Sequence, residues 1–291
     1  MPVAEFVEPS SLEEACHELA TEPSDSMALA GGTAVTLMLR QGLIAPRRLV
    51  SLARVADLDG IEARDGAVHI GACATLTRVA AAPTVLQRLP SLAHATQRVG
   101  NIRVRNVATM GGNVAEADYA SDPPAVLVSL GAECVIHSPR GTRRLPVDEF
   151  ITGFYSNALQ AGELLTEVIV PAPPGRRAVY HKYVSRSSED RPCVGVAARA
   201  DFDGPVVRDL DVVVGAVSAR PQRIPEATTL AAGQRLGDDL AAHIADAYRR
   251  GLDPMDDDRG SAWYRREMIQ VFVRRALTDL ATVVQEADAN G

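Results

Sequence analysis

Lysine and aromatic residues are scarce in this sequence of 291 residues. Lys182 is the single lysine among 30 Lys and Arg residues, and Phe, Trp and Tyr together supply 4% of the chain. A buried core must therefore rely on Val, Leu, Ile and Ala. The net charge of −7, with arginine pairs that are short and scattered, argues against a nucleic-acid groove as the main function.

Cysteine is also scarce, and its spacing does not suit a metal centre. The four residues form no CxxC pair and have no suitably spaced His beside them: Cys16, Cys73, Cys134 and Cys193. We therefore do not expect a zinc or iron–sulfur site within this chain. The N-terminal segment lacks the basic start and apolar run of a signal peptide, and no apolar stretch approaches the ~20 residues that span a bilayer. We expect a cytoplasmic, reduced protein with no membrane span.

The common nucleotide-binding and hydrolase motifs are missing as well. The chain contains no GxGxxG, GxxxxGK[ST], HExxH or GxSxG pattern, and its six His residues are scattered without metal-ligand spacing. No acid–base dyad or activated nucleophile stands out.

The pattern of apolar and turn residues that is present predicts mixed helices and strands. Residues 27–30 read as a short buried strand. Thr33 can cap a helix that follows, with Leu37 and Met38 facing inward. This first part of the chain is therefore expected to be a small unit of helices and strands.

A proline-rich segment at residues 171–175 is the best candidate for a linker. Before it, Asp65-Gly66 predicts a β-hairpin, and Asp122-Pro123-Pro124 predicts a helix start. Beyond it, three strand-like runs lie near residues 179–185, 194–201 and 211–217, and a long amphipathic helix is predicted near the C-terminus.

Two diglycine segments raise the question of a binding site: AGGTA at residues 30–34 and TMGGNV at residues 109–114. Each lies between an extended segment and a predicted helix start, and each carries small hydrogen-bonding side chains. Glycine is costly to order, and a diglycine alone is most often an ordinary turn. Bare N–H groups at a helix start also bind anions, so two such loops could hold a diphosphate from two sides.

Six segments, in order along the chain, resemble the FAD-binding medium subunit of the molybdenum hydroxylases, a family that includes aerobic carbon monoxide dehydrogenase and xanthine dehydrogenase. The first three are AGGTAVTLMLRQGLIAPRRLVSL, IGACATLTRVA and IRVRNVATMGGNVAEADYASDPPAVLVSLGAE. The similarity continues through EFITGFYSNALQAGELLTEVIVP, YHKYVSRSSEDRPCVGVA and DDDRGSAWYRREMIQVFVRRAL, and so covers nearly the whole chain. The pairing of AGGT with RNVATMGGN at this separation is far more specific than either motif alone.

The resemblance implies an α+β fold. It implies a two-subdomain FAD-binding region of the vanillyl-alcohol-oxidase (PCMH) type, then a smaller α/β C-terminal domain with a three-stranded sheet and helices. We expect the FAD-binding domain at residues 1–175, with subdomains at about 1–56 and 57–175. The C-terminal domain, of the carbon monoxide dehydrogenase flavoprotein type, is expected at residues 176–291.

The resemblance also implies that the two diglycine loops bind the pyrophosphate of FAD. The cofactor-binding residues are then Ala30, Gly31, Gly32, Thr33 and Ala34 on one side, and Thr109, Gly111, Gly112 and Asn113 on the other. Asp122 matches a family acid that contacts the cofactor, Leu165 a residue that packs near the flavin, and Lys182 a basic contact at the flavin end. The ordinary alternatives for these three are a helix N-cap, a core residue and a solvated charge. The first loop has no His that could tether the flavin, so we expect non-covalent binding.

Two positions beside the second loop depart from the family pattern. Glu116 stands where relatives often carry a small residue or His, and Tyr119 where they often carry Pro. Both positions edge the cofactor loop, so the fine contacts there are left open.

The function implied by the resemblance is electron transfer within a larger oxidoreductase. In the family, a large molybdopterin-binding subunit oxidises the substrate, and [2Fe-2S] clusters on a small subunit relay electrons. FAD on the medium subunit then passes them to NAD, oxygen or another acceptor. This role requires no acid, base or nucleophile of this chain, so the resemblance implies no catalytic side chain. We expect a dimer of heterotrimers and no nucleic-acid partner. The alternatives are a stand-alone FAD-dependent oxidoreductase with the same cofactor fold, and a non-catalytic nucleotide-binding protein.

Overall fold

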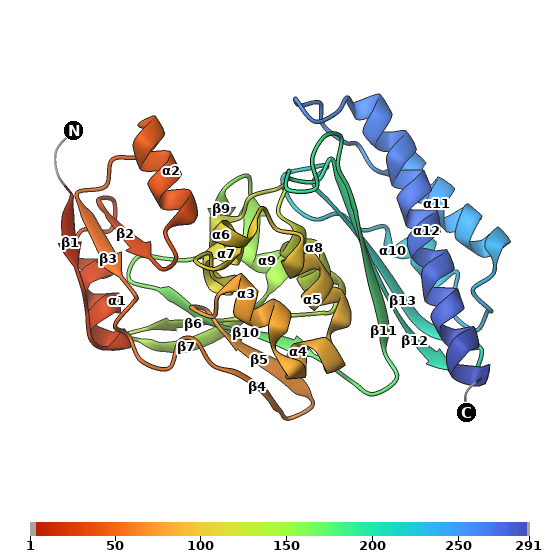
Figure 1. Ribbon diagram of the computed structural model, residues 1–291, viewed down its shortest axis with the longest axis horizontal. Helices are drawn as coiled ribbons and strands as arrows, with labels where there is room; N and C mark the ends of the chain where they lie inside the picture. Colours follow the sequence, from red (N-terminus) through yellow and green to blue (C-terminus); the bar gives the residue numbers. More distant parts are fainter. Residues whose placement is uncertain (1–3, 290–291) are drawn as a thin grey trace.

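The computed structural model describes residues 4–289 and the side chains up to residue 282 (Figure 1). The chain forms three successive units in a row, each built on its own sheet. The mixture of helices and strands, with a three-stranded sheet in the last unit, confirms the predicted α+β class.

The first unit is a small parallel sheet with two helices. Its strands lie in the order β1-β3-β2, and both pairings are parallel: β1 (Glu5–Val7), β2 (Ser26–Leu29) and β3 (Arg48–Ser51). The connections between them contain α1 (Leu12–Thr21) and α2 (Thr33–Gln41). Helix α1 buries Ala15, Cys16 and Leu19 in a small core shared with β3.

The second unit is a five-stranded antiparallel sheet in the order β4-β5-β10-β6-β7. Its strands are β4 (Ile61–Arg64), β5 (Ala67–Gly71), β6 (Glu133–Ser138), β7 (Gly141–Pro146) and β10 (Leu164–Pro171). The chain between β5 and β6 forms α3 (Leu76–Ala81), α4 (Pro83–Arg88), α5 (Pro90–Gln97), α6 (Ile102–Arg105), α7 (Met110–Glu116) and α8 (Asp122–Ser129). A short helix and a small hairpin precede β10: α9 (Val147–Phe150), β8 (Ile151–Gly153) and β9 (Ser156–Asn157).

The predicted hairpin at Asp65-Gly66 is confirmed. It joins β4 to β5, and both turn residues have positive φ, 51° and 76°. This conformation matches the twist of two paired strands, and Asp-Gly adopts it readily. The core under the sheet is mainly Val, Leu, Ile and Ala, as the low aromatic content predicts.

The third unit is an antiparallel sheet in the order β11-β12-β13: β11 (Arg177–Tyr183), β12 (Val194–Asp203) and β13 (Val206–Gly215). The three predicted strands are thus confirmed, although β13 begins earlier than predicted. Helices α5 and α8 contact this sheet from the second unit, while α12 (Ala262–Ala289) packs against it with α11 (Asp238–Gly251) beside α12 (Figure 1). A short α10 (Pro225–Thr229) completes the unit. Within residues 4–289 no helix, α12 included, is long and apolar enough to cross a membrane.

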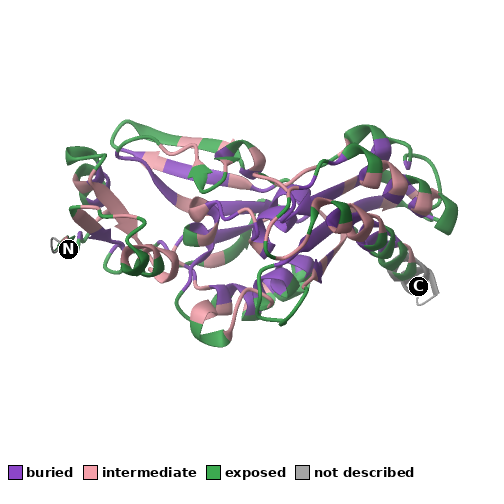
Figure 2. Ribbon diagram, turned by 90° about the horizontal axis from the view of Figure 1, so that it is seen from above, coloured by how far each residue is buried: buried purple, intermediate pink, exposed green. Residues whose placement is uncertain are grey.

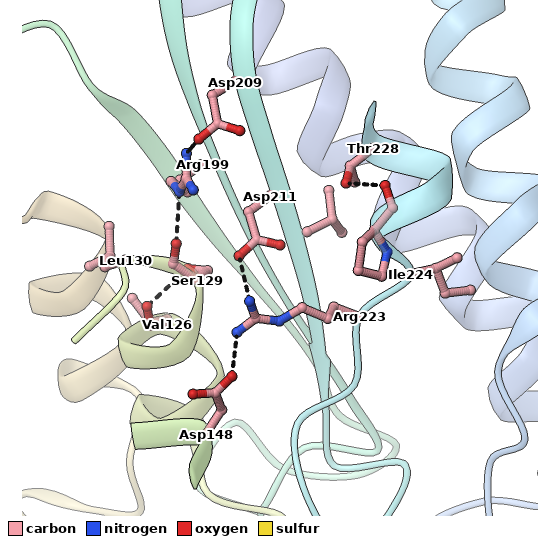
Figure 3. A network of polar contacts seen from close by, with 12 residues as sticks. Val126, Ser129, Leu130, Asp148, Arg199, Asp209, Asp211, Arg223, Ile224 and Thr228 are labelled. Atoms are coloured by element: carbon pink, nitrogen blue, oxygen red, sulfur yellow. Dashed lines mark hydrogen bonds and ion pairs between the residues drawn. The ribbon is translucent and has the colours of Figure 1, made fainter. Parts of the chain in front are cut away.

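Charged side chains of the third unit reach across to the second (Figure 3). Arg199 on β12 donates to the Ser129 carbonyl at the end of α8, at 3.0 Å. Arg223 lies 3.1 Å from the Asp148 carboxylate of α9 and 3.7 Å from that of Asp211 on β13. Burial raises the pKa of Asp211, and the charge of Arg223 opposes this rise. The two units are therefore joined by ionic contacts as well as by apolar packing.

Candidate cofactor site

The first diglycine loop joins β2 to α2 and ends in a left-handed residue. Gly32 has a φ of 68° and occupies the N-cap position, directly before Thr33. No side chain caps this helix, and the N–H groups of Gly32, Thr33 and Ala34 donate to no acceptor in the described part of the chain. The start of α2 therefore offers bare N–H groups and the positive end of a helix dipole, which together favour a phosphate.

Helix α2 leaves its apolar face uncovered. No residue of the helix is buried, and Leu37, predicted to face inward, is 50% exposed. The prediction for Leu37 is wrong, because α2 stands at the open side of the first unit, away from its small core (Figures 1 and 2). The loop and helix that would hold a phosphate are thus accessible from outside.

The second diglycine loop uses its N–H groups within the protein. Thr109 is the N-cap of α7, and its Oγ1 accepts the N–H of Gly112 at 3.1 Å. The N–H groups of Met110 and Gly111 donate to carbonyls of the segment after β5, at 2.9 and 2.8 Å. Positions 110–112 therefore have no bare N–H group to offer, and this loop can contribute only a surface and its side chains.

The structure brings the two loops together. A Cβ atom built on Gly31 would lie 1.9 Å from the Val107 carbonyl oxygen and 3.0 Å from the Cα atom of Ala108. The first loop thus lies directly against the segment that leads into the second. Only glycine permits this approach of one backbone to the other.

The two glycines of the second loop have different surroundings. A Cβ atom on Gly111 would lie 2.4 Å from the Cβ atom of Ala72, so glycine is needed there for α7 to pack against the segment after β5. On Gly112 it would meet only the Thr109 hydroxyl, at 2.8 Å, and Gly112 is exposed. Packing therefore explains Gly111, while the open side of Gly112 is free to face a ligand.

Asn113 is oriented by a residue that the sequence analysis did not single out. Asn113 Nδ2 lies 2.8 Å from Ser121 Oγ, which lies 3.0 Å from Asn113 Oδ1. Ser121 is the N-cap residue of α8 but makes no side-chain cap bond there. Its place directly before Asp122-Pro123-Pro124 was the available signal, since Ser often precedes a helix that begins with proline.

Asp122 forms a buried ion pair with the single lysine. Its carboxylate lies 3.0 Å from Lys182 Nζ and accepts the Tyr180 hydroxyl at 2.7 Å. Lys182 also donates to the Arg98 carbonyl at 2.7 Å, and its side chain is 1% exposed. Burial raises the pKa of Asp122 to about 6, although Lys182 and Tyr180 act in the opposite direction. Above that pH the ion pair joins α8 of the second unit to β11 of the third.

These contacts decide between some of the alternatives. Lys182 is not a solvated charge, since it is buried against Asp122. Leu165 lies on β10 inside the apolar core of the second unit, one residue before Thr166, whose carbonyl accepts the N–H of Ala72. Leu165 therefore does serve as a core residue close to the wall of the second loop. Direct contacts of these residues with a flavin stay predictions.

An acidic cluster borders the end of α7. Asp118 forms an ion pair with Arg191, whose Nε lies 2.9 Å from its carboxylate. The backbone nearby is in the left-handed region at Ala117 and at Tyr155, with φ of 50° and 49°. Burial, and then repulsion by Asp118, raises the pKa of Glu116 to about 7, against the opposing charge of Arg191. A carboxyl group that titrates near neutral pH thus stands at one of the two positions that depart from the family pattern.

The arrangement suits an extended anionic cofactor. The start of α2 provides bare N–H groups, Gly31 brings the second loop within reach, and Gly112 keeps one side open. Among the side chains that the structure describes, up to residue 282, no group of three or more His, Cys, Asp or Glu could hold a metal ion. The residues present therefore fit the pyrophosphate of a dinucleotide cofactor, held by backbone groups and small polar side chains.

Comparison with known proteins points to such a cofactor. Residues 2–173 match the family described as "FAD binding domain in molybdopterin dehydrogenase". Residues 179–280 match "CO dehydrogenase flavoprotein C-terminal domain". The glyceraldehyde dehydrogenase medium chain of Sulfolobus acidocaldarius is 32% identical over 281 residues, which are 96% of this chain and 99% of that one.

Solved structures agree with these matches. A chain of quinoline 2-oxidoreductase from Pseudomonas putida 86 superposes with a TM-score of 0.92 and 30% identity, covering 97% of this chain and 98% of that one. A chain of carbon monoxide dehydrogenase from Hydrogenophaga pseudoflava gives the same TM-score and identity, covering 98% and 99%. The likeness thus extends over all three units.

Proposed function

Because this chain belongs to the family of FAD-binding medium subunits of molybdenum hydroxylases, we propose that it transfers electrons within a larger oxidoreductase. It takes them from [2Fe-2S] clusters of a partner subunit and passes them through FAD to an external acceptor. The observation that carries the proposal is the contact of Gly31 with the Val107 carbonyl, which sets the two diglycine loops side by side. One loop supplies bare N–H groups, and the other supplies an open glycine surface.

In this proposal the FAD pyrophosphate lies at the start of α2. The N–H groups of Gly32, Thr33 and Ala34 donate to it, while Ala30 and Gly31 shape the turn. The opposite wall consists of Thr109, Gly111, Gly112 and Asn113, and Ser121 fixes the Asn113 amide. Asp122, Leu165 and Lys182 are assigned to the flavin end, and binding is non-covalent.

Bound FAD supplies chemistry that connects one-electron and two-electron steps. The residues of this chain bind and orient the cofactor, and the ion pair of Asp122 with Lys182 fixes the third unit against the second. We propose that the FAD-binding domain spans residues 1–175, with subdomains at about 1–56 and 57–175, and that the C-terminal domain spans 176–291.

The proposed partners are a large molybdopterin-binding subunit and a small [2Fe-2S] subunit, assembled as a cytoplasmic dimer of heterotrimers. This chain has no CxxC pair to hold a cluster, so the clusters must lie on another chain. The names of the similar proteins mention glyceraldehyde, quinoline and carbon monoxide, which are chemically unrelated. Substrate choice therefore belongs to the partner that holds the molybdenum.

The first test is flavin retention. The chain is incubated with FAD and desalted, alone and after co-expression with its proposed partners, and its visible spectrum is recorded. We expect roughly equimolar flavin, released intact as FAD on denaturation. Absence of flavin from both the isolated chain and the complex would overturn the proposal. Flavin that reoxidises with an acceptor but is never reduced through a partner would favour the stand-alone oxidoreductase.

Gly112→Val tests the loops themselves. The valine Cβ atom meets only the Thr109 hydroxyl, and the side chain occupies the open side of Gly112, so the protein should fold but retain less than a tenth of the wild-type flavin. Gly60→Val is the matched control, because a Cβ atom there meets nothing within 4 Å. A folded Gly112→Val protein with wild-type flavin content would refute the two-loop site.

A further inference from the structure

Gly112 and Glu116 share the outer face of α7. They are four residues apart, which places them one turn from each other on the same side of a helix, about 6 Å apart along its axis. The buried residues of this helix lie on the opposite side: Met110, Gly111 and Val114. A ligand that lies against the open side of Gly112 therefore meets Glu116 one turn further along the same face.

The Glu116 side chain has no partner in this position. Within the part of the chain that the structure describes, it makes no hydrogen bond and no ion pair. The residue is half-buried, but its two carboxylate oxygens are still accessible from outside. Glu116 is therefore able to bond directly to a ligand that lies along α7.

The groups around Glu116 are bonded to one another. Asp118 Oδ2 lies 2.9 Å from Nε of Arg191, which comes from the loop between β11 and β12. Asp118 Oδ1 accepts the N–H of Ala120 at 3.1 Å and the hydroxyl of Tyr155, in the turn between β8 and β9, at 3.4 Å. The guanidinium that acts on Glu116 is thus already paired with Asp118, and Glu116 must keep a proton or find another partner.

The protonation state of Glu116 decides what it offers to a ligand. Burial, and then repulsion by Asp118, raises the pKa of Glu116 to about 7, against the charge of Arg191. Tyr155, the other titratable group beside it, has a raised pKa and stays neutral. A protonated carboxyl group donates a hydrogen bond, whereas a carboxylate only accepts and carries negative charge. Near neutral pH, Glu116 therefore changes from attracting an anion beside Gly112 to repelling it.

We propose that protonated Glu116 donates a hydrogen bond to a phosphate oxygen of FAD. This inference rests on the proposed function, because the phosphate is that of the cofactor at the start of α2. The N–H groups of α2 bind one side of the pyrophosphate. Helix α7 uses its N–H groups at positions 110–112 internally, so it contributes a side-chain donor instead. Once ionised, Glu116 repels the phosphate, and FAD affinity falls as the pH rises.

The pH dependence of FAD binding tests the inference. The flavin-free protein, as the full chain and in the co-expressed complex, is titrated with FAD at pH 6 and pH 8, and flavin fluorescence gives the Kd. We expect the Kd to be about tenfold higher at pH 8, because the free protein has then lost a proton that the complex keeps. Calorimetry at pH 8 in buffers of different ionisation enthalpy should show uptake of about one proton per FAD, since FAD has no group that titrates near neutral pH.

Two variants separate the proton from the shape of the side chain. Glu116→Gln keeps a hydrogen-bond donor without the charge, so its Kd at both pH values should match that of wild type at pH 6, and the proton uptake at pH 8 should be lost. Glu116→Ala should also lose the pH dependence but bind FAD at least about threefold more weakly than Glu116→Gln. Glu226→Gln removes an exposed carboxylate on α10 and is the matched control, which should behave as wild type. Asp122, with a pKa of about 6, is present in all four proteins, so the comparison isolates Glu116.

The outcomes separate this inference from the proposed function. Equal FAD affinity of wild type at pH 6 and pH 8 overturns the role of Glu116 and leaves FAD binding in place. A Glu116→Gln variant that keeps the wild-type pH dependence does the same. Failure of wild type to bind FAD at either pH, alone and in the complex, overturns both the inference and the proposed function.

Discussion

The two diglycine loops share a dipeptide but differ in almost every physical respect. The first loop has bare N–H groups and leads into α2, a helix with no buried residue. The second loop has its N–H groups bonded at positions 110–112 and leads into α7, which packs on the segment after β5. The first loop therefore has N–H groups free to bind a ligand, whereas the N–H groups of the second loop stabilise its own conformation.

The difference extends to the surroundings of each loop. The first unit is mostly exposed or half-buried, whereas the region around α8 is largely buried (Figure 2). The second loop is connected through Ser121 and Asp122 to the third unit, and two carboxyl groups with a raised pKa, Glu116 and Asp122, lie on its side of the molecule. A cofactor between the loops would thus lie against the well-packed second loop. It would be bound by the N–H groups of the first loop, which has fewer buried neighbours.

Lys182→Met should produce the largest loss of stability on the anchored side. It leaves the buried Asp122 carboxylate without its ammonium partner, which costs about 3 kcal/mol at pH 8. The loss should shrink as the pH falls from 8 to about 6, because without Lys182 the pKa of the Asp122 carboxyl rises further and the variant takes up a proton at a higher pH than wild type does. Urea unfolding at both pH values measures this. Asp122→Asn/Lys182→Met removes both charges and should recover part of the loss, and an equal loss for both variants would contradict the ion-pair explanation.

Gly111→Ala should be the next most damaging change. The new methyl group would lie 2.4 Å from the Ala72 side chain, and such overpacking costs about 2–3 kcal/mol. Gly112→Ala adds a methyl group one residue later, meets only the Thr109 hydroxyl and should change the free energy of unfolding by less than about 1 kcal/mol. Equal destabilisation by the two variants would remove the distinction between a packing glycine and an open one.

Glu116→Gln should stabilise the protein at alkaline pH. The pKa of Glu116 is raised to about 7, so the folded state keeps its proton to a higher pH than the unfolded state does. Its contribution to stability is present below the ordinary carboxyl pKa and is lost as pH rises towards about 7. The variant should therefore gain about 1–2 kcal/mol over wild type at pH 8 and nothing at pH 4. Parallel stability profiles for the two proteins across this range would exclude a raised pKa.

Gly32→Ala should have the smallest effect of the four. Alanine in a left-handed conformation costs about 1 kcal/mol, and Gly32→Asn should cost less, because Asn tolerates that conformation. Neither change removes the N–H groups of the first loop, so flavin retention after desalting should stay near wild type. Loss of flavin from the Asn variant would show that the loop does more than present its backbone.

Local patterns were sufficient for the elements but not for their contacts. The Asp65-Gly66 hairpin and the strands of the third unit follow from turn chemistry and alternation, which act over a few residues. The contact of Gly31 with Val107 joins segments far apart in the chain. The two loops alone suggested that they could share a diphosphate, and the resemblance to a family was needed to predict that they form one site. The exposure of Leu37 could not be predicted, because periodicity identifies an apolar face but not whether anything covers it.

The burial of Lys182 could not be predicted from the sequence either, because it depends on a contact between distant segments. A lone lysine reads as a solvated charge, and its partner Asp122 lies in another domain of the sequence. The N-cap position of Ser121 could have been predicted, since a Ser before Asp-Pro-Pro indicates a helix start. Its bond to Asn113 depends on how two helices meet, which no local pattern encodes.

The single buried lysine makes this protein unusually easy to interrogate by chemical labelling. Every other basic side chain except the six His residues is arginine, so an amine-selective acylating reagent can modify only one side chain, Lys182. That amine is enclosed between α8 and β11 and is bonded to Asp122 and to the Arg98 carbonyl. Acylation located at Lys182 by peptide mapping, and so distinguished from acylation of the α-amino group, therefore counts the molecules in which the second and third units have come apart.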